Sequence, residues 1–309
     1  MPSETRIGIS GWIYPPWRGV FYPKGLTQKR ELEYASRTFN SIEINGSFYS
    51  LQRPESYQSW HDATPDDFVF AVKGGRFITH MKKLKEVEAP LANFLASGLL
   101  KLKQKLGPIL WQFPPGFAFN EQRFDTFFAM LPRSTADAAR IARRHDARMA
   151  GRAFTRTDAD RPMRHAVEIR HESFRDPRFL ALLRKHRIAL VVADTAGKWP
   201  LIDEITTDFM YARLHGDQEL YVSGYSPEAL DTWAGRVKKW QRRQCDVYVY
   251  FDNDAKVKAP FDALQLAARL QGRDPHPPPL ELLENAGEAA RPHWPAIRRA
   301  SPARPARRA

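Results

Sequence analysis

Eight short apolar segments of the sequence, separated by segments of helical pattern, have the length and composition of β-strands, and several of them alternate apolar and polar residues with a period of two. They are 6–12, 41–49, 68–74, 108–113, 164–171, 188–194, 209–215 and 246–252. Between them, apolar residues recur at helical spacing, which predicts helices over 27–39, 89–105, 121–131, 177–186, 227–243 and 260–270. The segments after the second and sixth strands show only a short or irregular helical pattern.

This alternation of strands and helices predicts a parallel sheet, because parallel neighbours need a crossover connection between them. Eight such units that close on themselves form a TIM-type (β/α)₈ barrel, and we expect residues 1–270 to form it. The two weak connections make an irregular barrel compatible with the pattern. An open, doubly wound α/β sheet is the alternative architecture.

Inside the strands, aliphatic residues share one parity and polar residues the other. Ile42 and Ile44, for example, alternate with Glu43 and Asn45. The aliphatic parity should pack under the helices, which turns the polar parity toward the barrel axis. Polar side chains therefore gather near the carboxyl ends of the strands, where barrel enzymes keep their active sites. These residues are Glu43, Asn45, Lys73, Gln112, Glu168, Arg170, Asp194, Arg213, His215 and Asp252.

The formal net charge of +13 is of the kind found in nucleic-acid-binding proteins, but most of the excess positive charge lies in two segments outside the predicted strands. Residues 133–164, between the fourth predicted helix and the fifth strand, hold nine Arg against four Asp. The segment 271–309 holds eight Pro and shows no apolar period, which predicts a disordered basic tail. Both segments follow helices, so we expect them at the barrel end opposite the site. Any nucleic-acid binding should then be weak, salt-sensitive and independent of the site.

Other classes of function find little support in the sequence. Cys245 is the only cysteine, which excludes an intrachain disulfide and a Cys-based zinc site and fits a reducing, cytoplasmic location. No apolar segment is long enough to span a bilayer, so we expect no membrane association. A Walker loop and a GxGxxG motif are both absent, and we predict no organic cofactor.

Several motifs, in order, resemble those of the YecE-like family, also known as domain of unknown function 72. They include Gly8-Ile9-Ser10-Gly11-Trp12, Glu43-Ile44-Asn45, Phe70-Ala71-Val72-Lys73, Thr79-His80, Trp111-Gln112-Phe113-Pro114-Pro115, Glu168-Ile169-Arg170-His171 and Tyr211-Ala212-Arg213-Leu214-His215-Gly216. The resemblance covers roughly residues 6–270 and implies a TIM-type barrel without a defined reaction. The chain departs from the family pattern in its long 133–164 segment, in Phe174 where a Trp is usual, and in Asp252, where the pattern resembles Asn.

The clustered ionisable groups favour an enzyme, of hydrolase, lyase or isomerase type, that uses carboxylate acid/base chemistry on a polar, anionic or sugar-like ligand. We predict that Glu43, Glu168 and Asp194 supply the carboxylates. The predicted ligand-binding residues are Asn45, Lys73, Gln112, Arg170, Arg213, His215, Trp12 and Tyr49.

Two alternatives from other classes stay open at the level of sequence. The first is a metal-dependent phosphodiesterase or nuclease that holds a divalent cation, although cations in the same cluster would repel a metal. Its ligands would come from Glu43, Glu168, His171, Asp194, His215 and Asp252. The second is a non-catalytic ligand-binding barrel, because a fold does not fix a function.

Overall fold

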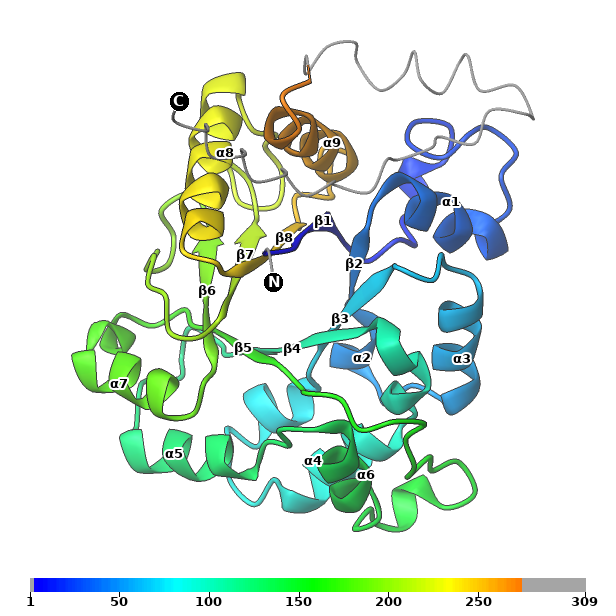
Figure 1. Cartoon of the computed structure of the whole chain (residues 1–309), viewed down its shortest axis with the longest axis vertical. Helices are drawn as coiled ribbons and strands as arrows, with labels where there is room; N and C mark the ends of the chain where they lie inside the picture. The colour runs from blue at the N-terminus through cyan, green and yellow to red at the C-terminus, as the bar shows by residue number, and fades with distance from the viewer. Residues whose placement is uncertain (1–2, 274–309) are drawn as a thin grey trace, which may run out of the picture.

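The computed structural model describes residues 3–273, and these residues form a closed barrel of eight parallel strands surrounded by helices (Figure 1). Each strand pairs with the next in the chain, and β1 pairs with β8 to close the barrel. The strands are β1 (Thr5–Ser10), β2 (Ser41–Ile44), β3 (Val69–Lys73), β4 (Leu106–Gln112), β5 (His165–Glu168), β6 (Ala189–Asp194), β7 (Phe209–Leu214) and β8 (Asp246–Phe251). The predicted barrel is confirmed, and the open-sheet alternative is wrong.

Within residues 3–273, eight α-helices longer than one turn, together with short helical turns, follow the strands. The α-helices are α1 (Glu31–Thr38), α2 (Gly46–Tyr49), α3 (Pro54–Asp62), α4 (Glu88–Ala96), α5 (Glu121–Met130), α6 (Thr135–Ala142), α7 (Pro177–Lys185), α8 (Pro227–Arg242) and α9 (Ala259–Leu270), of which α2 is a single turn. The other turns are η1 (Pro15–Trp17), η2 (Gln28–Arg30), η3 (Phe77–Met81), η4 (Leu99–Lys105), η5 (Ala147–Met149) and η6 (Glu172–Arg175). No helix within residues 3–273 has the length and apolar content needed to cross a membrane.

Two connections differ from the sequence pattern, and a third agrees with it. The predicted strand 41–49 ends at Ile44, and its second half forms α2. The predicted helix 89–105 divides into α4 and η4 at Gly98, whose φ of +109° and approach to Pro54 exclude a side chain: a Cβ there would lie 2.4 Å from the Pro54 Cα. Residues 195–208, all of them described, contain no α-helix, so the expected irregularity after the sixth strand is real.

The barrel interior below the mouth is filled by side chains of β3 to β8. Large rings of β7 and β8 face small residues of β3, β5 and β6, which lets the layers fit within the barrel. The cluster comprises Ala71, Leu110, Ala166, Ala189, Val191, Ala193, Phe209, Tyr211, Tyr248 and Tyr250. Because these residues are buried, the barrel is a packed core from its amino-terminal end up to this layer, and a ligand can enter only from the carboxyl ends of the strands.

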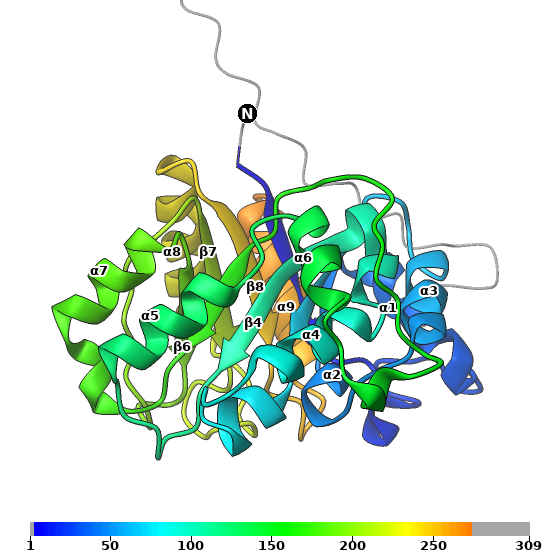
Figure 2. The same cartoon turned by 90° about the horizontal axis from the view of Figure 1, so that it is seen from below.

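The Arg-rich segment 133–164 folds against α4 and does not stay at the end where it leaves the barrel. The backbone N–H of Asp146 donates to Oδ1 of Asn93 (3.0 Å), and that of Phe154 donates to the Ala96 carbonyl (2.8 Å). Figure 2 shows the green chain after α6 running along the outside of the barrel toward the end where α2 lies. The prediction that this whole segment lies at the far end from the site is therefore wrong. Of the predicted tail, 271–309, residues 274–309 lie outside the described residues.

Candidate ligand site at the barrel mouth

Arg213 is the centre of a buried charge cluster just above the aromatic core. It projects from β7, and its Nη2 donates to Oε1 of Glu43 and to Oδ2 of Asp252, both at 2.8 Å. Its Nη1 donates to Oε2 of Glu168 at 2.7 Å. The hydroxyl of Tyr211 and the hydroxyl of Ser10 donate to Glu43 as well. One guanidinium thus joins carboxylates from β2, β5 and the end of β8, which lie on different sides of the barrel.

The predicted catalytic residues Glu43 and Glu168 lie beneath the ligand pocket and do not face it. Both are fully buried, as is Arg213, and none of the three lines the pocket. Burial opposes ionisation of Glu168, but the neighbouring Arg170 and Arg213 hold its pKa well below the usual range. Glu43 and Glu168 both lie on the inward face that the sequence predicted, yet neither lines the pocket, because strand parity gives the face of a residue and not its depth along the barrel axis. Together with Arg213, Glu43 and Glu168 form a buried ionic layer beneath the pocket, which we call the floor.

A pocket of about 810 Å³ opens above this floor. Five of the predicted site residues line it: Asn45, Tyr49, Lys73, Gln112 and Arg170, joined by Asp252 from the predicted metal-ligand pool. The remaining lining residues are Tyr14, Phe48, Arg76, His80, Met81, Tyr221 and Asp254. The pocket therefore combines charged and amide side chains with aromatic rings.

Lys73 is a buried cation that has no ion-pair partner among the described residues. Its side chain is 7% exposed, and Nζ lies 4.4 Å from the centroid of the Phe48 ring. Burial, with the repulsion of Arg213, lowers the pKa of Lys73 to about 8. An ammonium in this position is poorly compensated, so a bound anion would stabilise its charged form.

Arg170 supplies a second set of donors at the base of the pocket. Its Nε donates to Oε1 of Glu168 (2.8 Å), and its guanidinium carbon lies 3.9 Å from the centroid of the Trp199 ring, which fixes the plane of the group. Within residues 3–273, neither Nη atom donates a hydrogen bond. Gln112 lines the same pocket, and the buried Oδ1 of Asn45 lacks a hydrogen-bond donor in the described part of the chain.

Two carboxyl groups with opposite tendencies stand in the pocket wall. Burial opposes the ionisation of Asp252, but Arg213 and His215 keep its pKa well below the usual range, so this carboxyl stays ionised. Burial and the neighbouring Asp252 charge raise the pKa of Asp254 to about 6. The Tyr14 hydroxyl, which donates to the Ser10 carbonyl, lies beside Asp254. Such a divergence of two pKa values is the usual basis for separating a general base from a general acid.

The two histidines near the pocket differ in position. His215 is buried in the floor, where Nδ1 lies 3.0 Å from Oδ2 of Asp252, so it does not reach the ligand pocket as predicted. His80 lines the pocket, and its ring centroid lies 5.0 Å from that of Phe48. Burial and the charge of Lys73 lower the pKa of His80 to about 4, so its imidazole is neutral at pH 7.

Three predicted residues lie away from the pocket. Asp194 shares its parity with Leu190 and Val192, which face the helices, and it accepts a hydrogen bond from Nε1 of Trp233 on α8 (3.2 Å). Trp12 packs edge-on against Trp60 of α3, with ring centroids 5.3 Å apart. The third, His171, bonds locally, with Nδ1 2.9 Å from the Ser173 Oγ. The prediction that Asp194 converges with the other charged residues is wrong, because aliphatic neighbours of the same parity place it in the outer layer.

The charge cluster does not favour the metal-dependent alternative. Glu43, Glu168 and Asp252 do converge, but the Arg213 guanidinium occupies the space between them. Two further residues of the predicted metal-ligand pool lie away from this cluster. His171 bonds locally to Ser173, and Asp194 lies in the outer layer beside Trp233. Across residues 3–273, no group of three or more His, Cys, Asp or Glu side chains is arranged to hold a metal ion.

The lining residues that sequence reasoning missed come mainly from loops. Arg76 and Met81 follow β3, while Tyr221 and Asp254 follow β7 and β8. Period-two alternation stops where a strand stops, so no pattern marked their direction. Their position in the sequence could have identified them, because the loops that follow the strands of a barrel surround its mouth.

Comparison with known proteins places the chain in a family. The profile described as "Protein of unknown function DUF72" matches residues 6–283. UPF0759 protein YecE of Escherichia coli K12 is 32% identical over a match that covers 40% of this chain and 50% of the relative. For UPF0759 protein YunF of Bacillus subtilis, the identity is 32% and the coverage 36% and 40%. The chain thus spans half or less of the length of these curated relatives.

Solved structures of the same family share the fold. A DUF72 family protein from Thermotoga maritima is 28% identical and superimposes with a TM-score of 0.69, covering 87% of this chain and 99% of that one. A DUF72 family protein from Enterococcus faecalis has a TM-score of 0.64 at 19% identity, covering 86% and 95%. The YecE-like resemblance read from the motifs is confirmed, and the chain belongs to the DUF72 family.

Proposed function

We propose that this protein is an enzyme that binds a small anionic ligand in the mouth pocket and acts on it by carboxylate acid/base chemistry. The observation that carries the proposal is the arrangement of Lys73 and Arg170, two buried or nearly buried cations whose unused donors line one pocket. A phosphate or carboxylate would complete their coordination, with Arg170 offering its two Nη atoms as a fork. Gln112 and Asn45 would orient the uncharged part of the ligand.

Asp252 and Asp254 are better placed for proton transfer than the acids selected from the sequence. Both line the pocket, whereas Glu43 and Glu168 lie beneath it and Asp194 lies behind it. Asp252, held ionised by Arg213, would accept a proton from the ligand. Asp254, with its raised pKa, would donate one. The proposed chemistry draws only on side chains of this chain.

Anion affinity should depend on the protonation of Lys73. We expect the association constant for sulfate, whose charge is constant in this range, to fall on the order of tenfold per pH unit above pH 8. Below pH 8 the ammonium is charged and binds the anion; above it the neutral amine does not. Isothermal titration calorimetry between pH 6.5 and 9.5 measures this change.

The fall in sulfate affinity above pH 8 can be assigned to Lys73 because the neighbouring groups titrate outside this pH range. The pKa of His80 is about 4, that of Asp254 is about 6, that of Asp252 lies far below neutrality, and that of Arg213 lies far above the range, so the change expected between pH 7.5 and 9.5 belongs to Lys73. A Lys73→Met variant should bind sulfate more weakly at every pH and with a flat profile from pH 7.5 to 9.5. If the wild-type profile is flat as well, Lys73 is not part of the anion site.

A screen followed by two variants tests the proposed function. Thermal-shift measurements with phosphorylated and carboxylated small molecules should yield ligands whose stabilisation is lost in Lys73→Met. Turnover of such a ligand should fall at least 100-fold in Asp252→Asn and Asp254→Asn, with binding retained. The Asn at position 252 matches the resembled family pattern, so the fold should accept it. Wild-type turnover in both variants, or binding without any turnover, would contradict the acid/base proposal and favour a binding barrel.

A further inference from the structure

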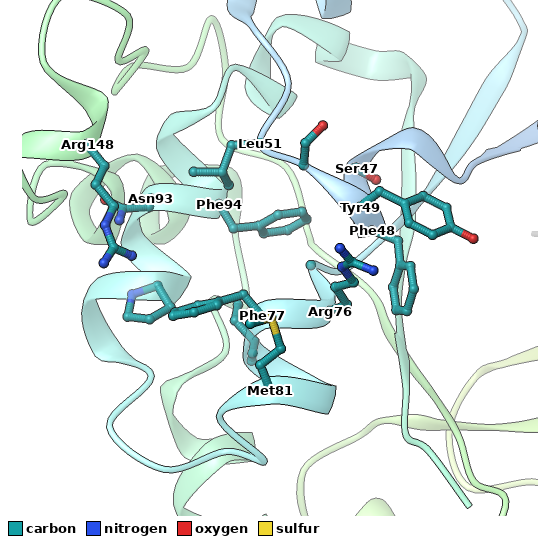
Figure 3. Close-up of a pocket in the computed structure, with 14 residues that line it drawn as sticks. Ser47, Phe48, Tyr49, Leu51, Arg76, Phe77, Met81, Asn93, Phe94 and Arg148 are labelled. Carbon is teal, nitrogen blue, oxygen red and sulfur yellow. The ribbon is translucent and has the colours of Figure 1, made fainter.

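A second, smaller pocket of about 210 Å³ lies directly beside the mouth pocket (Figure 3). The two pockets share part of their walls, namely Phe48, Tyr49, Arg76 and Met81. Phe48 stands at this boundary, and Nζ of Lys73 lies over its ring. A ligand that binds Lys73 therefore has the second pocket next to it.

The second pocket is suited to an aromatic ring. Its walls are formed by Leu51, Phe77, Ile78 and Phe94 together with Met81, and Figure 3 shows the Phe77 and Phe94 rings on its wall. A cavity of about 150 Å³ lined by such residues is large enough to hold benzene, so a pocket of about 210 Å³ has space for a six-membered ring with substituents. Apolar side chains on several sides favour a flat apolar group over a charged one.

Both ends of the second pocket carry arginines stacked on aromatic rings. The Arg76 guanidinium carbon lies 5.6 Å from the centroid of Tyr49, and that of Arg148 lies 5.6 Å from the centroid of Phe77. Arg148 belongs to η5 in the 133–164 segment, which explains why that segment reaches the mouth end. Because these two guanidinium groups repel cations, the pocket favours neutral or anionic ligands.

Two exposed apolar side chains occupy the ridge between the pockets. Tyr49 and Met81 are 64% and 65% exposed, although both line both pockets. Water contact of these groups is unfavourable, and a ligand lying across the ridge would cover them. A small anion confined to the mouth pocket would leave them uncovered.

We infer that the two pockets form one bipartite site for an anion that carries an aromatic ring, such as an aryl phosphate or aryl carboxylate. The inference rests on the proposed anion site and names its ligand class. The anionic head binds Lys73 and Arg170, and the ring lies past Tyr49 and Met81 in the pocket lined by Phe77 and Phe94. The second pocket then determines specificity, because the head group alone does not distinguish among small anions.

Matched ligand pairs test this inference without knowledge of the natural substrate. The Kd values of phenyl phosphate and methyl phosphate are measured by calorimetry, with phenylacetate and acetate as the carboxylate arm. Each aromatic ligand should bind wild-type protein at least tenfold more tightly than its methyl counterpart, because only the ring buries apolar surface. The arm with the greater affinity identifies the head group.

Two variants assign the gain to the second pocket. Leu51→Trp fills this pocket and should remove the preference for the aromatic ligand while leaving the Kd of methyl phosphate unchanged. Phe77→Ala removes one wall of the pocket and should reduce the preference for the aromatic ligand. This variant replaces Leu51→Trp if circular dichroism shows that Leu51→Trp does not fold. Lys73→Met should weaken the aromatic and methyl ligands by the same factor.

The outcomes separate the two proposals. Equal affinities for aromatic and methyl ligands in wild-type protein, or a preference unchanged in Leu51→Trp and Phe77→Ala, would overturn the bipartite site and leave the anion site standing. Failure of every anion to bind, or binding unaffected by Lys73→Met, would overturn the proposed anion site itself.

Discussion

Replacing Arg213 by Met is expected to lower the free energy of unfolding by about 4 to 5 kcal/mol at pH 7, because breaking a buried ion pair leaves uncompensated charge. The substitution removes the single partner shared by Glu43, Glu168 and Asp252, and the first two have no access to water. Chemical denaturation monitored by circular dichroism measures the loss. A decrease below about 1 kcal/mol would show that the cluster is not electrostatically coupled to the fold.

The pH dependence of the same variant provides a control. In wild-type protein the pKa values of Glu168 and Asp252 are depressed by Arg213, so their stabilisation is present at neutral pH and is lost as the pH falls. Without Arg213 the buried carboxyls become more basic, and the variant should gain stability from pH 7 to pH 5. Combining Arg213→Met with Glu43→Gln and Glu168→Gln should recover most of the loss.

A second large effect is expected for Gly8→Ala in β1. A Cβ at Gly8 would lie 1.8 Å from the carbonyl oxygen of Ser41, its partner in β2, so the two strands would have to separate. Ser41 cannot readily move, because its Oγ lies 2.6 Å from the hydroxyl of Tyr250 inside the barrel. We expect a loss of about 3 kcal/mol or more in stability, measured by urea denaturation.

Gly235→Ala is the matched control for this substitution. Gly235 lies within α8, and a Cβ there would meet no atom within 4 Å. Alanine should therefore raise the stability by about 0.5 to 1 kcal/mol through helix propensity. If both glycine variants change stability alike, the close contact at Gly8 is not the cause of the effect.

The barrel followed from the sequence because strand and helix periods are local properties that this chain expresses clearly. Where local pattern and tertiary context disagreed, the pattern failed. Residues 46–49 continue the alternation of β2, yet they turn into α2, in which the Ser47 hydroxyl donates to the Lys73 carbonyl (2.7 Å). The break at Gly98 likewise depends on the nearby Pro54, which is remote in sequence.

The sequence predicted which side chains point into the barrel, but it did not predict how far along the barrel axis each of them lies. Lys73, Gln112 and Arg170 line the pocket as their parity indicated. Glu43 and Glu168 have the same inward direction, but the stagger of the strands places them one layer lower, where Arg213 covers them. Asp254 and Arg76 lie beyond strand ends, and their positions follow from loop conformations that no residue pattern in this sequence specifies.

The ion cluster around Arg213 also has a consequence for the order in which the chain assembles. Its members are contributed by β2, β5, β7 and the residue after β8, so Arg213 acquires its full set of partners only when residue 252 is available. On the ribosome, a nascent chain that ends before β8 would hold the charges of the earlier strands without their last partner. The last partner of Arg213 thus arrives together with the closure of the barrel, which discourages stable half-barrel fragments and couples the end of β8 to β2, β5 and β7 during synthesis.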